Sequence, residues 1–399
     1  MLNFKKYAKQ IERSIVENRR ALHRRPEPGF AEHRTTGFIQ EELRRCGIDI
    51  IPWGGSTGVV GLLNGTRKNS AGENRCVALR ADIDALPVTE AVACNFCSEN
   101  QGFMHACGHD AHMAGLLGAA RILSERREEF GGKIKFIFQP AEEVMQASGA
   151  RLMLQAGVLE NPEVGFIFGM HCTPEAEAGQ ICLPHGALTA ATALTFLRVT
   201  GAGGHGALPH LAKDPLVASA AIIMALQTLI SREIHSGEAA VISFGSIHGG
   251  TAGNIIPEQV EIYGTARAID ADIFNYMERR MGEIIALTGQ ALRVNTEFEF
   301  RRGPPSCVNP PELADWAGAG PLREVFGQRN ILPFKPVLVG EDFACFQEKI
   351  PGLLCWFGVG NKAKNIAAPL HSSFFQIEES ALYLAAATYA QVACDWLNR

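Results

Sequence analysis

The first part of the chain alternates between two patterns of apolar residues. Apolar side chains that recur every three or four positions predict helices with one buried face. Short apolar runs bounded by Gly, Pro or polar residues predict strands. The expected helices are residues 7–22, 36–46 and 112–124, and the expected strands are 59–63, 76–83, 133–138 and 166–171. This alternation predicts an α/β sheet covered by helices on both faces, with active-site groups at strand ends.

The pattern changes after Leu188. The following segment predicts the order strand, helix, strand, strand, helix, strand, which is typical of a ferredoxin-like α+β sandwich. Its expected elements are residues 195–199, 216–230, 240–246, 260–266, 273–287 and 294–300. Beyond it, proline-rich turns lead back to further helix and to a strand at 353–359. We therefore expect a two-domain α/β protein, with a catalytic domain of residues 1–186 and 303–399 and an inserted domain of residues 187–302.

Composition places the chain among ordinary globular proteins of two-domain size. It has 399 residues, 47% hydrophobic and 20% charged, with a formal net charge of -5. Lysine and arginine are scattered rather than gathered into a stripe, which argues against a nucleic-acid partner. The most apolar stretch, residues 218–226, is shorter than the ~20 residues of a membrane span, so no membrane partner is expected either.

Eleven cysteines without a secretory signal predict a reducing, cytoplasmic setting rather than a disulfide framework. One pair, Cys94-Asn95-Phe96-Cys97, has the spacing of a redox dithiol or of half a zinc site. No second pair follows at zinc-ribbon spacing, and the pair lies in a polar loop rather than at a helix start. We interpret it as incidental, and keep a thiol-redox protein as an alternative.

Candidate metal chemistry begins in His105-Ala106-Cys107-Gly108-His109-Asp110, at the start of a predicted helix. Thiolate and imidazole suit zinc and similar ions, although a turn rich in Cys and His can also serve packing alone. Glu142 and Glu143 directly follow an apolar strand. Adjacent side chains point in different directions, so one carboxylate can hold a metal while the other activates its water.

Other candidate residues are individually ambiguous. His171 ends an apolar run, and His371 lies in a loop near the C-terminus. Each could be an ordinary buried histidine. Asp82 ends a strand, where it could be a ligand, a group that orients a ligand histidine, or the partner of Arg80. In the inserted domain, glycines around His205 permit close backbone approach to a ligand. Arg267 could clamp a carboxylate or pair within its domain.

Taken together and in this order, these segments resemble the amidohydrolase branch of the aminoacylase and carboxypeptidase superfamily, which includes hippurate hydrolases, auxin-conjugate hydrolases and N-acetyl-diaminopimelate deacetylases. The resemblance runs over nearly the whole chain, from residues 22–29 to residues 370–372. It implies a metal-binding α/β catalytic domain and an inserted lid domain that also forms a homodimer or a higher oligomer.

The resemblance also implies roles for particular residues. Two divalent ions would be bridged by Cys107 and a water, zinc being expected first and manganese, nickel or cobalt being alternatives. His109 and His171 would complete the shell of one ion, and Glu143 and His371 that of the other, a division that the sequence leaves open. Glu142 resembles the general base and Asp82 the carboxylate behind a ligand histidine. In the lid, His205 resembles the residue that reaches the substrate carbonyl, while Asn254 and Arg267 match substrate-binding positions.

The function expected from this sequence is hydrolysis of the amide bond of N-acyl amino acids to a carboxylic acid and a free amino acid. A metal ion lowers the pKa of a bound water toward ~7, so a carboxylate can take its proton at neutral pH. A metallo-dipeptidase or exopeptidase with the same site is the main alternative. A catalytically silent binding protein on the same fold is another.

Overall fold

The computed structural model describes residues 3–68, 75–144 and 147–399, and it confirms the expected α/β class with a large mixed sheet. The chain divides into two compact units. Unit 1 comprises Met1–Leu188, Val308–Lys335 and Asp342–Arg399, and unit 2 comprises Thr189–Cys307 and Pro336–Glu341. The sequence placed the boundaries at residues 187 and 302 and did not anticipate the second segment of unit 2.

Unit 1 is built on an eight-stranded sheet of order β1-β2-β4-β3-β5-β16-β6-β15. The strands are β1 (Asp49–Ile51), β2 (Val59–Asn64), β3 (Cys76–Asp82), β4 (Lys133–Gln139), β5 (Phe166–Glu177), β6 (Ile181–Cys182), β15 (Ile331–Leu332) and β16 (Gly352–Gly360). A separate two-stranded pair joins β7 (Gly186–Ala187) and β14 (Val308–Asn309). The central strands β4, β3, β5 and β16 are parallel, so their carboxyl ends meet at one edge of the sheet.

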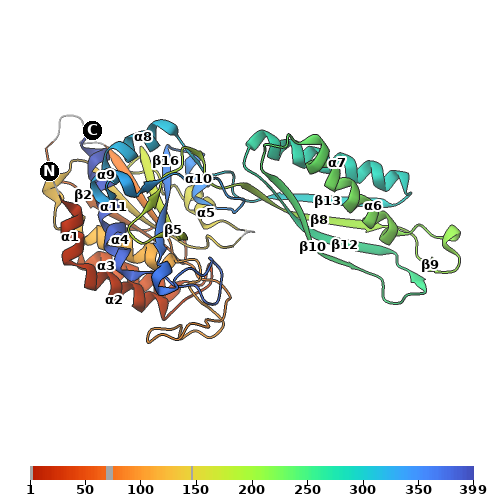
Figure 1. Cartoon of the computed structure of the whole chain (residues 1–399), viewed down its shortest axis with the longest axis horizontal. Coiled ribbons are helices and arrows are strands. Elements are labelled where there is room, and N and C mark those ends of the chain that lie inside the picture. The colour runs from red at the N-terminus through yellow and green to blue at the C-terminus, as the bar shows by residue number, and fades with distance from the viewer. Residues whose placement is uncertain (1–2, 69–74, 145–146) are drawn as a thin grey trace. The chain divides into compact units, whose positions relative to one another are not determined.

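Helices of unit 1 pack against this sheet (Figure 1). They are α1 (Phe4–Gln10), α2 (Glu12–His23), α3 (His33–Arg45), α4 (His109–Ser124), α5 (Gly149–Gln155), α8 (Pro311–Ala319), α9 (Pro321–Phe326), α10 (Phe343–Gln347) and α11 (Leu382–Leu397). Helices α4 and α11 contact the central strands and each other. A Cβ atom on Gly115 or Gly118 would come within 3 Å of Ala385 or Ala386, so small residues allow these two helices to approach closely.

Several elements differ in their bounds from the sequence-based expectation, and three of these differences affect the description of unit 1 most. The helix expected at residues 7–22 is two helices, which are separated at Ile11. The helix expected from residue 112 already begins at His109, because Gly108 adopts the left-handed conformation that precedes its first turn. The strand expected to end at His171 continues to Glu177, paired along its length with β16.

Unit 2 is a four-stranded antiparallel sheet of order β10-β12-β8-β13 with two long helices. Its elements are β8 (Ala191–Thr200), α6 (Pro215–Thr228), β10 (Ala240–Gly249), β12 (Gln259–Ala268), α7 (Ala271–Ala291) and β13 (Asn295–Arg302). They follow the expected order of strand, helix, strand, strand, helix, strand. The buried faces of both helices and of the sheet form a hydrophobic core of their own.

Helix α6 is the most apolar helix of unit 2. With the turn that follows it, residues Pro215–Glu233 are long and apolar enough to cross a membrane by length and composition, which corrects the shorter stretch of residues 218–226 expected from the sequence. Ala218, Ile222 and Leu226 are buried within the core of unit 2. One face of α6 therefore packs into the core of unit 2, while only 33% of the apolar window is buried.

Candidate metal centre

The polar end of the central strands gathers the predicted site residues of unit 1. Asp82 is the last residue of β3, and Glu142 and Glu143 follow the end of β4 after a short turn. Arg80 of β3 pairs with Gly169 of β5, so His171 lies two residues further along its strand. These strands are parallel neighbours, and their carboxyl ends are the usual position of active sites in α/β sheets.

The turn before α4 carries two of the expected ligands, Cys107 and His109. Gly108 between them has φ 85°, a conformation that costs little only for glycine. A Cβ atom at this position would lie 3.0 Å from Cβ of Cys172. Glycine is therefore required both for the sharp turn and for the close approach of α4 to β5, which brings His109 and His171 into the same site.

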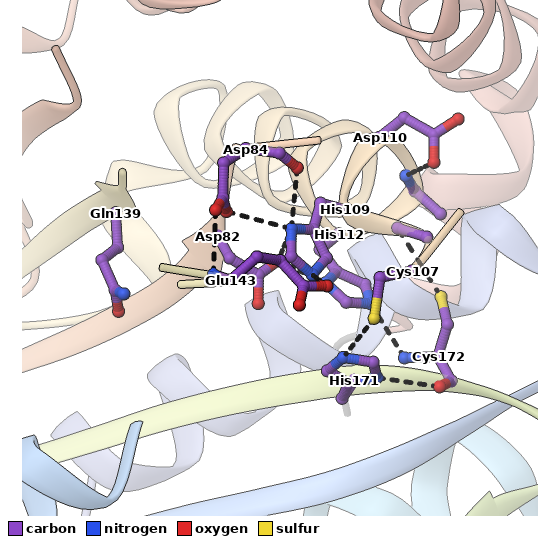
Figure 2. Close-up of polar contacts among 12 residues, drawn as sticks. Asp82, Asp84, Cys107, His109, Asp110, His112, Gln139, Glu143, His171 and Cys172 are labelled. Atoms are coloured by element: carbon purple, nitrogen blue, oxygen red, sulfur yellow. Dashed lines mark hydrogen bonds and ion pairs between the residues drawn. The ribbon is translucent and has the colours of Figure 1, made fainter. Parts of the chain in front are cut away.

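The five expected ligands form two sets of donor atoms that share Cys107. In one set are Cys107, His109 and His171, and in the other are Cys107, Glu143 and His371, with the donor atoms of each set within 4.8 Å of one another. Cys107 Sγ lies 3.5 Å from His171 Nε2, and Glu143 Oε1 lies 3.2 Å from His371 Nε2. Figure 2 shows His171 and Cys107 pointing toward one another, with His109 and Glu143 beside them.

The hydrogen bonds of the two imidazoles leave their Nε2 atoms directed into the site. Nδ1 of His109 donates to the carbonyl oxygen of Asp84 at 2.9 Å, and Nδ1 of His171 donates to the carbonyl oxygen of Cys172 at 2.8 Å. Nε2 of His109 is buried and makes no hydrogen bond. An Nδ1 bond to the protein is the usual way of presenting Nε2 to a metal. The donor set of one thiol, three imidazoles and one carboxylate fits zinc and related divalent ions.

Negative charge surrounds these donors. Burial lowers the pKa of His109, but the carboxylates of Asp82, Asp84 and Glu143 outweigh it and raise that pKa to about 10. Burial, followed by the nearby carboxylates of Glu143 and Glu142, raises the pKa of the Cys107 thiol well above its usual range. The carboxylates act in the same direction on both groups and create a negative potential that favours a bound cation.

Residues behind the donors differ in part from the sequence-based expectation. The carboxylate of Asp82 accepts a hydrogen bond from the imidazole of His112, with 2.5 Å between Nδ1 and Oδ1. The same carboxylate oxygen lies 3.8 Å from Nδ1 of His109. Asp84 contacts two donor residues. Its backbone carbonyl accepts the hydrogen bond from His109, and its side-chain carboxylate accepts the N–H of Glu143 at 2.9 Å. Asp84 and His112 were not among the supporting residues expected from the sequence. Asp84 could have been found from its position two residues after Asp82, since alternate residues of an extended segment share a face.

Strained backbone occurs at one donor residue and directly before another part of the site. His371 has φ 65°, and Ala141, which precedes the Glu142-Glu143 pair, has φ 53°. Such values are uncommon for residues other than glycine and concentrate at functional sites. The backbone N–H of each residue makes a hydrogen bond that holds this conformation. The N–H of His371 donates to the carbonyl of Ala106 at 2.8 Å, and the N–H of Ala141 donates to the carboxylate of Glu32 at 2.8 Å.

The candidate residues of unit 2 fall into two places within that unit. His205, on β9 (Gly204–His205), pairs with Ile255 of β11 (Ile255–Ile256), and the N–H of Gly206 donates to the carbonyl of Asn254 at 2.8 Å. His205 and Asn254 are therefore neighbours, and both are exposed. Arg267 lies near the far end of β12, where its guanidinium donates to the carbonyl of Leu338 at 2.8 Å.

Comparison with known proteins identifies the family. The pattern of Peptidase family M20/M25/M40 matches residues 78–395. The chain belongs to this family. Together with the donor set described above, membership makes the protein a metal-dependent amide hydrolase, as the sequence analysis predicted.

Three curated members of the family are similar along almost their whole length. Thermostable carboxypeptidase 2 of Saccharolobus solfataricus is 36% identical over 98% of this chain and 97% of its own. N-acetyl-L-cysteine deacetylase of Bacillus subtilis is 35% identical over 93% of this chain and 85% of its own. IAA-amino acid hydrolase ILR1-like 5 of Arabidopsis thaliana is 37% identical over 96% and 86%, respectively.

A solved structure from the family supports the same grouping. The YXEP protein of Bacillus subtilis, described as a dinuclear metal-binding peptidase from the M20 family, is 33% identical to this chain. The two structures superpose with a TM-score of 0.82 over 98% of this chain and 99% of the other. The M20 fold therefore extends over both units of the present chain.

Proposed function

We propose that this M20 enzyme hydrolyses the amide bond of N-acyl amino acids with two divalent metal ions, zinc being the first candidate. The observation that carries the proposal is Cys107, which belongs to both sets of donor atoms. One ion would be held by Cys107, His109 and His171, and the other by Cys107, Glu143 and His371. When bound there, the ions would lower the pKa of a coordinated water and polarise the amide carbonyl.

Glu142 is the proposed proton carrier. Its neighbour Glu143 is directed to His371 at 3.2 Å, whereas Glu142 lies close enough to Cys107 for its charge to raise the thiol pKa. In the proposed reaction the carboxylate of Glu142 takes the proton of the attacking water and then gives it to the leaving nitrogen. Asp84 supports this step by fixing the backbone of Glu143 and the ring of His109.

The choice of substrate class rests on the acyl-amino acid activities named for two relatives, the N-acetyl-L-cysteine deacetylase and the IAA-amino acid hydrolase. The test is an assay of N-acetyl, N-benzoyl and indole-acetyl amino acids after reconstitution of the metal-free protein with zinc, manganese, nickel or cobalt. We expect turnover of at least one acyl class, which the metal-free protein lacks. Hydrolysis of none of them by metal-replete protein contradicts the proposal.

A second candidate function is that of an exopeptidase, because one relative is named a carboxypeptidase. The same panel separates the two if dipeptides with a free amino group are added. A free substrate amine carries a positive charge and requires an acidic partner, whereas an acyl group does not. Preference for the free-amine dipeptides over the matching N-acetyl compounds favours the exopeptidase.

We further propose that unit 2 acts as a lid and forms a homodimer. Apolar residues on its helices, Val217 and Met224 of α6 and Leu287 of α7, are more than half exposed, and clusters of exposed apolar side chains mark interaction surfaces. In this proposal His205 stabilises the developing oxyanion on a substrate bound by the partner subunit, and its neighbour Asn254 contacts the same substrate. Arg267, at the other place in unit 2, would bind a substrate carboxylate from there.

A mixed dimer tests the contribution of His205. Glu142→Gln and His205→Ala chains, each inactive by itself, are co-expressed with different tags, and the heterodimer is purified through both. If His205 serves the partner's site, one of the two sites regains both groups, and turnover returns to about half of the wild-type value. A heterodimer as inactive as its parents contradicts this arrangement, as does a monomer in light scattering.

A further inference from the structure

Two cysteines outside the metal centre lie unusually close together. Cys94 and Cys97 belong to the loop between β3 and α4, and their Sγ atoms are 2.8 Å apart. The sequence analysis interpreted this pair as incidental because no second pair accompanies it. In the structure, however, the distance between the two sulfur atoms exceeds the length of a disulfide bond, about 2.05 Å, by less than 1 Å.

The geometry favours a dithiol over a metal site. Glu90 lies close enough to complete a set of three possible donors, but its two carboxylate oxygens already contact His23 Nε2 at 3.1 Å and the N–H of Ser98 at 2.6 Å. Two thiolates on one tetrahedral zinc ion, with Zn–S bonds of about 2.3 Å, lie about 3.8 Å apart. The observed sulfur separation is much shorter.

The two thiols differ in their surroundings. Sγ of Cys97 accepts the backbone N–H of Cys94 at 3.0 Å, and it also lies 3.2 Å and 2.8 Å from the carbonyl oxygens of Val92 and Cys94, to which its thiol can donate. Burial and the hydrogen bond to Cys97 raise the pKa of Cys94 to about 12. The N–H directed at Cys97 and the raised pKa of Cys94 together favour Cys97 as the first nucleophile, with Cys94 positioned to react second.

A small molecule can reach this pair. Cys94 lines a surface cavity of about 200 Å³ together with Glu90, Phe96 and Lys364. Both cysteines are only partly buried, unlike most of the other thiols of the chain. Thiol–disulfide exchange requires access as well as a thiolate. The cavity gives access to Cys94, and Cys97, whose Sγ lies 2.8 Å from that of Cys94, is itself partly exposed.

We propose that Cys94 and Cys97 form a reversible disulfide by exchange with a low-molecular-weight disulfide. The Cys97 thiolate attacks one sulfur of that compound, forms a mixed disulfide and releases one small thiol. The Cys94 thiol then loses its proton to solvent, and its sulfur attacks the Cys97 sulfur and releases the second small thiol. The two cysteines are oxidised by two electrons, and the small disulfide is reduced to two thiols.

Hydrogen bonds connect this loop to the metal centre. The N–H of Ala91 donates to the carbonyl of Ser373 at 2.9 Å, two residues after the proposed ligand His371. A second path starts at Glu90, which contacts His23; Nδ1 of His23 lies 2.8 Å from the carboxylate of Asp110 in the first turn of α4. Closing the disulfide draws the two sulfur atoms together, which would move the loop against both anchors.

We expect the oxidised protein to turn over its substrate several-fold more slowly and to release metal faster to a chelator. This effect on turnover rests on the proposed function, whereas formation of the disulfide does not. The test treats metal-replete protein with glutathione disulfide, then blocks free thiols and maps the peptides by mass spectrometry. Wild-type protein should contain a Cys94–Cys97 disulfide, which dithiothreitol reverses together with the loss of turnover.

Single variants separate the two thiols. Cys94→Ser should accumulate a mixed disulfide on Cys97, Cys97→Ser should show no disulfide at Cys94, and the double variant should keep its turnover and metal under the same treatment. Two free thiols in treated wild-type protein overturn the proposal. If the untreated double variant lacks one metal equivalent, the disulfide proposal is overturned in favour of a metal site. If the disulfide forms without any change in turnover or metal release, the link to the metal centre is overturned.

Discussion

Replacing Glu142 by glutamine is expected to lower kcat by about 10²–10⁴-fold while metal content stays at the wild-type level. Glutamine has nearly the same size as glutamate but cannot accept the proton of the attacking water. Glu142 is not among the five side chains that form the two donor sets, so its replacement leaves the proposed ligands intact. Turnover of an N-acyl amino acid and elemental analysis of the same sample check both halves of the prediction.

The neighbouring residue supplies a matched control. Glu143→Gln makes the same chemical change one position away, but Glu143 belongs to a donor set with Cys107 and His371. We expect this variant to lose metal as well as activity, and high metal concentrations to restore part of the activity. Near-normal turnover of Glu142→Gln at full metal occupancy would show that another group moves the proton.

Cys107→Ala is expected to have the second large effect, a loss of bound metal from both positions. Its sulfur is the atom shared by the two donor sets, and a thiolate is a strong ligand for zinc. Without the metal ions, both the lowered water pKa and the polarised carbonyl are lost, which predicts a fall in kcat/KM of about 10³-fold or more. Elemental analysis after purification in metal-containing buffer measures the occupancy directly.

Cys172→Ala is the control for this variant. Cys172 is also buried, follows His171 and contacts Gly108, yet its thiol belongs to neither of the donor sets that share Cys107. Metal content should stay near the wild-type value in this variant. Equal metal loss in both variants would mean that packing around α4, rather than ligation by Cys107, controls occupancy.

Much of the fold follows from local sequence pattern. The apolar run at residues 76–83 is long, rich in small and aliphatic residues and bounded by polar positions, and it forms the fully buried strand β3. The pattern failed at element ends. The break at Ile11 and the early start of α4 at His109 depend on backbone angles and tertiary contacts, for which apolar periodicity contains no information.

The site was predictable to a similar degree. Residue types with metal-ligating chemistry at strand ends identified Cys107, His109, Glu143, His171 and His371 as candidates, and the structure brings their donor atoms together. The contacts that support the donor residues were harder to predict from the sequence. Asp82 was expected behind a ligand histidine, but it bonds His112, because the turn of α4 determines which imidazole faces the end of β3.

The sequence by itself therefore determined the class of the fold, the two-part organisation and the residue types of a metal-dependent hydrolase. Only the tertiary structure decided how the other donors divide into two sets that share Cys107, that Asp84 supports His109 and Glu143 together, and that Cys94 and Cys97 lie within reach of a disulfide. The physical reason is the same in each case. Chemistry is a property of the side chain, whereas distance between residues far apart in the chain is set by how strands and helices pack.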